Sequence, residues 1–99
     1  MTQQFSPSQQ ARIDERLRIA KLPRSNKSIH DAEVGDLITC GYSFYVIVSL
    51  QPYNGYENAL MEMFCLDQCP NTGKWGYLQF TTTKHQFWVM DRECKDLVR

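Results

Sequence analysis

The feature that most constrains the fold is a change of hydrophobic periodicity near residue 34. In residues 43–50, SFYVIVSL, side chains alternate, so that Phe44, Val46, Val48 and Leu50 point one way and the residues between them the other. Period-two alternation rich in aromatic and β-branched residues is typical of a strand with one buried face. We therefore expect a strand here, with Phe44 and Val46 in the core.

Four further segments have the composition of strands: residues 36–40, 59–66, 75–82 and 86–90. Residues 59–66 are apolar on both sides of the alternation, which predicts a central or doubly covered strand. Asn54-Gly55, ahead of that segment, is the strongest short hairpin signal. Short strands at intervals of about ten residues predict a small antiparallel barrel or sandwich.

The start of the chain follows a helical pattern instead. Ser6 is a favoured N-cap, Pro7 suits the first helical position, and Gln9 completes a capping box. We expect a helix over residues 7–21 that ends before Pro23, followed by a polar linker. Its apolar residues fall at spacings of four and three and predict a narrow docking stripe: Ile13, Leu17 and Ala20.

These patterns predict an α+β, mainly β, chain of 99 residues. Residues 1–28 would form a basic amphipathic helix and linker, and residues 29–99 a small five-stranded antiparallel β-barrel or roll. Within residues 29–50, a turn, the run VGDLI, a glycine and the run FYVIV resemble the first two strands of many SH3-like barrels. This resemblance concerns the fold alone and implies no functional residues.

Charge is distributed unevenly along a chain of zero formal net charge. Residues 1–30 contain six Lys or Arg and two acids, whereas residues 31–99 contain five Lys or Arg and nine acids. A basic arm on an acidic body can bind nucleic acid, or it can pack on the body itself. The sequence shows neither a signal peptide nor a membrane-spanning run, so a cytoplasmic location without membrane association is predicted.

The four cysteines raise the question of a metal site or disulfides. Cys65 and Cys69 are four apart, but no second close pair exists, since Cys40, Cys94, His30 and His85 are each isolated. A structural zinc site usually needs two closely spaced ligand pairs. In a reducing cytosol we therefore interpret the cysteines as free thiols and predict no metal and no cofactor.

Catalytic signatures are also missing from the sequence. The five glycines never cluster into a phosphate-binding loop, and no local motif places a nucleophile beside a histidine. We predict no enzyme and no catalytic residues. A small nuclease or thiol-dependent hydrolase assembled from dispersed residues remains a third hypothesis.

The remaining signal is aromatic. If the core contains Phe44, Val46, Leu78, Phe80, Phe87 and Val89, four rings lie on the outer face: Tyr45, Trp75, Tyr77 and Trp88. Exposed rings of this kind mark interaction sites, unless the N-terminal helix or the C-terminal tail covers them. The leading hypothesis is thus a non-enzymatic protein-binding module whose partner is another protein or an identical subunit. Its small size would suit an accessory or inhibitor-type protein of a mobile element.

The alternative hypothesis is a nucleic-acid-binding module. The same rings would stack on bases, and the helix would contact phosphates through Arg12, Arg16, Arg18 and Lys21.

Overall fold

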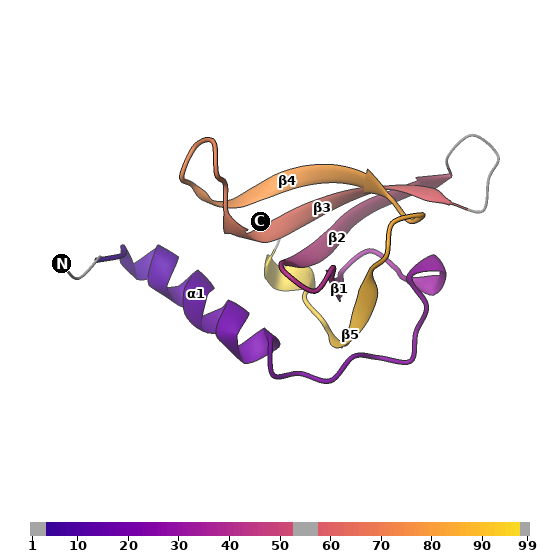
Figure 1. The fold of residues 1–99 in the computed structure, drawn as a ribbon, viewed down its shortest axis with the longest axis horizontal. Helices are drawn as coiled ribbons and strands as arrows, with labels where there is room; N and C mark the ends of the chain where they lie inside the picture. Colours follow the sequence, from indigo (N-terminus) through magenta and orange to yellow (C-terminus); the bar gives the residue numbers. More distant parts are fainter. Residues whose placement is uncertain (1–3, 53–57, 98–99) are drawn as a thin grey trace.

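The computed structural model describes residues 4–52 and 58–97 and contains one helix and one antiparallel sheet (Figure 1). In chain order the elements are α1 (Pro7–Ile19), η1 (Ile29–Asp31), β1 (Asp36–Thr39), β2 (Phe44–Pro52), β3 (Ala59–Gln68), β4 (Trp75–Thr82), β5 (Trp88–Glu93) and η2 (Lys95–Leu97). The predicted class, an N-terminal helix followed by five antiparallel strands, is confirmed. The predicted Asn54-Gly55 turn lies outside the described residues.

The strands form one sheet in the order β4-β3-β2-β1-β5, and every neighbouring pair is antiparallel. β3 lies between β2 and β4, which confirms its predicted central position. β4 and β5 are the two terminal strands of this sheet and are not paired with each other, so the sheet is an open roll. No helix in the described ranges is long and apolar enough to cross a membrane.

The start of α1 follows the predicted capping box. The Ser6 hydroxyl accepts from the Gln9 N–H, and the Gln9 side chain accepts from the Ser6 N–H at 2.9 Å. The helix ends at Ile19 with Ala20 as C-cap, slightly earlier than predicted. It lies along one side of the sheet near β3 (Figure 1), and Ile19 at its end is buried with Leu37 of β1 and Met90 of β5.

The sheet buries side chains on both of its faces. On the face that α1 packs against, here called the helix face, the buried residues are Ile19, Leu37, Val46, Leu66, Met90 and Cys94. On the opposite face, here called the far face, they are Ala32, Ile38, Tyr45, Ile47, Met61, Met63, Cys65 and Val89. The alternation of the strands predicted one core with an exposed outer face, and that prediction is wrong for the middle of the sheet.

The docking side of α1 also differs from the prediction. Ile19 is fully buried, whereas Leu17 is 59% exposed and Ala20 is exposed. The side that meets the sheet contains Arg12, Glu15, Arg16 and Ile19, which have the i, i+3, i+4, i+7 spacing of one helix face. A narrow apolar stripe was predicted, but the observed docking face is mostly charged.

Ion pairs hold that charged face in place. Arg16 Nε lies 2.7 Å from Asp67 Oδ1, and Arg92 Nη1 lies 2.5 Å from Glu15 Oε1. The guanidinium of Arg12 stacks over the Phe64 ring, 5.1 Å from its centroid. Partial desolvation strengthens such contacts, so they can anchor a helix whose only fully buried side chain is Ile19.

Candidate protein-interaction surface

The four predicted surface rings do not share one exposed face. Tyr45 is 8% exposed and belongs to the far-face cluster, so its predicted exposure is wrong. Trp75, Tyr77 and Trp88 are half-buried. Trp75 and Trp88 lie on β4 and β5, the two opposite ends of the sheet, and cannot form a joint surface with Tyr45.

Each half-buried ring is engaged inside the chain. Trp75 meets Phe5 edge-on, with ring centroids 6.2 Å apart, and Arg24 stacks on Trp88 at 4.0 Å. Tyr77 packs against the far-face cluster, where its hydroxyl bonds the Cys65 thiol. That bond, together with burial, raises the pKa of Tyr77.

The exposed apolar surface lies instead on β4. Leu78 is 54% exposed and Phe80 64% exposed, although both were predicted to be core residues. The register places Leu78 beside Phe64 and Phe80 beside Glu62, so both side chains lie on the helix face. α1 covers this face at Phe64 but not at Phe80. The uncovered end of the helix face thus exposes Leu78 and Phe80, with Glu62 beside Phe80.

The two terminal strands of the sheet differ at their outer edges. Along β5, Ser25 N–H donates to Val89 O at 2.7 Å, and Asp91 N–H donates to Pro23 O at 3.0 Å. The predicted polar linker therefore covers the β5 edge. Along β4, no strand or bridge among the described residues pairs with the outer edge. We call this outer edge, together with the side chains of Leu78 and Phe80, the β4 edge.

Backbone hydrogen bonding shows which β4 residues face outward. Thr83 N–H donates to Ala59 O at 2.9 Å, in continuation of the Leu60↔Thr82 register. In an antiparallel ladder, successive residues alternately direct both backbone polar groups toward one neighbour or away from it. The backbone groups of Leu78 and Phe80 therefore point away from β3, toward the open side.

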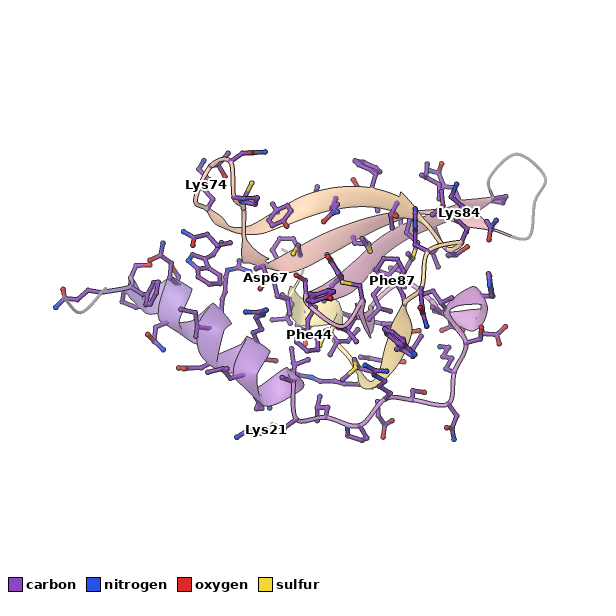
Figure 2. The ribbon with its side chains drawn as sticks, in the orientation of Figure 1. Lys21, Phe44, Asp67, Lys74, Lys84 and Phe87 are labelled. Carbon is purple, nitrogen blue, oxygen red and sulfur yellow. The ribbon has the colours of Figure 1, made fainter. Side chains whose placement is uncertain are left out.

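Apart from the register shift near Gly76, the β4 edge also lacks the features that keep sheet edges monomeric. Such edges are usually blunted by charges, proline or short length. β4 spans eight residues, WGYLQFTT, with no charge and no proline. Lys74 and Lys84 lie beyond its two ends, as Figure 2 shows.

The basic residues of the nucleic-acid hypothesis are largely engaged within the chain. Arg12 stacks on Phe64, Arg16 pairs with Asp67, and Arg18 pairs with Glu15 at 2.5 Å. Lys21 is exposed (Figure 2). Burial acts to raise the pKa of Glu15, but hydrogen bonds from Arg18 and Arg92 outweigh it and lower the pKa below its ordinary value.

All four cysteines are free thiols. Cys65 and Cys94 are buried, and burial raises their pKa; Cys40 and Cys69 are half-exposed with lowered pKa. Among residues 4–52 and 58–97, no group of three or more His, Cys, Asp or Glu side chains is placed to hold a metal ion.

Sequence reasoning missed the β4 edge because alternation alone cannot tell which face is covered. The uncharged run from Trp75 to Thr82 was the available signal, since a strand free of charge at the end of a sheet is unusual. Comparisons with protein-family models, curated proteins and solved structures give no match for this chain.

Proposed function

We propose that this chain is a non-enzymatic protein-interaction module that binds its partner through the β4 edge. The observation that carries the proposal is the coincidence of exposed Leu78 and Phe80 with outward-facing backbone groups on an uncharged terminal strand. Strand addition uses these two elements together, because backbone hydrogen bonds supply affinity and alternate side chains supply specificity.

The surface proposed here replaces the ring surface expected from the sequence. Trp75 and Tyr77 belong to β4 and border the new surface, whereas Trp88 lies at the other end of the sheet. The resemblance of residues 29–50 to SH3-like barrels stays a prediction, as does the cytoplasmic location.

Nucleic-acid binding has less support. Three of its four proposed contact residues, Arg12, Arg16 and Arg18, contact groups of the chain itself. Freeing Arg12 or Arg16 would break contacts that hold α1 on the sheet. If nucleic acid were nevertheless the ligand, affinity would fall steeply with salt.

Site-specific photo-crosslinking tests the proposal. A photoreactive phenylalanine analogue at position 80 should crosslink to a protein chain in cells that produce the protein. The same analogue at Asn26, an exposed residue of the segment along β5, serves as the matched control and should give no adduct. Absence of any protein adduct from position 80 would contradict the proposal.

A further inference from the structure

We infer that the partner at the β4 edge is a second copy of this chain, paired β4 to β4 in antiparallel register about Gln79. This inference rests on the proposed function and names its partner. Three observations support it: the outer edge of β4 is unpaired within the described residues, β4 carries no charge, and the direction of its backbone groups limits the register.

The open edge is confined to one end of the sheet. Residues 23–25 cover β5, so a copy that adds a strand has β4 as its available edge within the described ranges. Two β4 edges related by a two-fold axis present the same surface to each other, which is the isologous arrangement of most homodimers. The resulting sheet would run continuously through both copies.

Charge allows this approach between identical chains. The chain has zero formal net charge, and β4 itself carries none. A second copy therefore meets no repulsion along the strand and needs no complementary charge. At the two ends, however, a register centred on Gln79 brings Lys74 of one copy near Lys84 of the other, since the two lysines lie beyond opposite ends of β4 in each chain (Figure 2). Salt should screen these like charges and strengthen the dimer.

The outward direction of the Leu78 and Phe80 backbone groups limits the register. In an antiparallel pair, residues that exchange hydrogen bonds must both point toward the partner. Pairing Leu78 with Phe80 of the second copy satisfies this rule and centres the two-fold axis on Gln79. The same register aligns the apolar side chains of both copies into one patch on the helix face, where cross-strand aromatic and aliphatic pairs stabilise a sheet.

A register centred on Leu78 also satisfies the backbone rule, but it places Phe80 opposite Gly76. Gly76 has a φ of +81° and lies at a register shift, with Phe64 and Arg12 in the space beside it. That arrangement gives Phe80 no cross-strand side chain. A register centred on Phe80 satisfies the backbone rule too, but it places Leu78 opposite Thr82, so the register centred on Gln79 is the one that pairs Leu78 with Phe80. We therefore assign the register centred on Gln79.

The first test is the light-scattering mass of the full chain at increasing concentration. We expect the mass to rise from the single-chain value of 11.6 kDa toward twice that value between about 10 µM and about 1 mM, the range of small transient interfaces. In high salt the same rise should occur at lower protein concentration. Phe80→Ser and Leu78→Ser should each raise the dissociation constant about tenfold or more. The matched control, Leu17→Ser, replaces an equally exposed leucine on α1 and should leave it unchanged.

The second test reports the register. In a chain with Cys40 and Cys69 replaced by Ser, Gln79→Cys should form a disulfide between copies, because facing residues of a non-hydrogen-bonded pair lie about 4.5 Å apart at Cα. The matched variant Thr81→Cys should not, since the register separates its two thiols. Equal crosslinking by both variants would contradict the register.

Two results separate this inference from the proposed function. A monomeric mass at every concentration, combined with a crosslink from position 80 to a different protein, would overturn the homodimer and leave the interaction module standing. A dimer that Phe80→Ser and Leu78→Ser do not weaken would overturn the β4 homodimer, because a surface other than the β4 edge would then hold the copies together. If position 80 also gave no protein adduct, the proposed function would be overturned as well.

Discussion

Gly76 and Arg12 share one small space on the helix face of the sheet. A Cβ atom on Gly76 would lie 2.7 Å from Arg12 Nη1 and 2.6 Å from Cζ of Phe64. The Arg12 guanidinium stacks on the same Phe64 ring. The absence of a side chain at residue 76 thus allows α1 to reach the sheet.

Gly76→Ala should therefore destabilise the fold for two separate reasons. A φ of +81° costs an ordinary residue about 1–2 kcal/mol, and displacing Arg12 from Phe64 adds a similar amount, so the free energy of unfolding should fall by about 2–4 kcal/mol. Urea unfolding measures this loss. Gly73→Ala is the matched control, since it has a φ of +71° and only an ordinary 3.6 Å contact with Gln68. Equal losses of unfolding free energy in both variants would show that the position of Arg12 does not depend on the absence of a side chain at residue 76.

Glu15→Gln should weaken the attachment of α1 by about 1–2 kcal/mol, because the Glu15 carboxylate joins Arg18 of its own helix to Arg92 of β5. The lowered pKa of Glu15 means that the native state favours the charged form. Its stabilisation is present above the ordinary pKa of 4.5 and is lost as pH falls through the lowered native value.

Acid unfolding of the wild type and of Glu15→Gln should therefore converge at low pH. Asp14→Asn, at an exposed position of the same helix, should unfold in parallel with the wild type. A constant stability difference between Glu15→Gln and the wild type from pH 7 to low pH would contradict this role.

Tyr45 should make the fold sensitive to alkali. Burial, together with the hydrogen bond to the Cys40 thiol, raises the pKa of Tyr45 to about 12 from an ordinary 10.0. The neutral phenol is therefore favoured in the native state. Its stabilisation is complete below pH 10.0 and is lost as pH rises toward about 12.

Tyr45→Phe should accordingly lose less stability than the wild type over that interval, as measured by thermal unfolding at stepped pH. Tyr42→Phe is the control, because Tyr42 is 84% exposed. An alkaline stability profile of Tyr45→Phe identical to that of the wild type would rule out the proposed contribution.

The four thiols should react in an order set by their exposure and by the pKa of each thiol. Cys69 lies in the β3–β4 turn, where hydrogen bonds from Thr72 lower its pKa. Burial opposes ionisation of Cys40, but backbone N–H groups of Tyr42 and Ser43 outweigh it. Iodoacetamide at neutral pH should modify Cys69 and Cys40 first, because the thiolate is the reactive form.

Cys65 and Cys94 should react only after denaturant is added, since both are buried with raised pKa. Peptide mass spectrometry at successive times measures the order. Early labelling of Cys65 in the native protein would contradict the far-face packing described above.

Local signals predicted the elements of this fold well. The Ser6 and Gln9 capping box and the strand at Trp75–Thr82 occur where local chemistry determines them. The central position of β3 was predictable because its side chains are apolar on both faces. A register shift between Ile47 and Ser49 then changes which β2 residues share a face, a feature that strict alternation could not show.

The interaction surface was harder to predict because it depends on coverage. The exposure of Phe80 reflects where α1 stops, and α1 docks through charged residues that pattern analysis assigns to solvent. Tyr45 is buried because it packs on the far face with the side chains of Ile38 of β1 and Val89 of β5. Such long-range contacts leave no trace in local periodicity.

The pairing of residues 23–25 with β5 has a consequence for synthesis of the chain. β1 and this segment both pair with a strand that lies about fifty to seventy residues further along the chain. At about 5–20 residues per second, the ribosome needs several seconds to deliver it. Until then the edge of β1 in the β1–β2–β3–β4 meander stays open, and residues 23–25 have no strand to pair with.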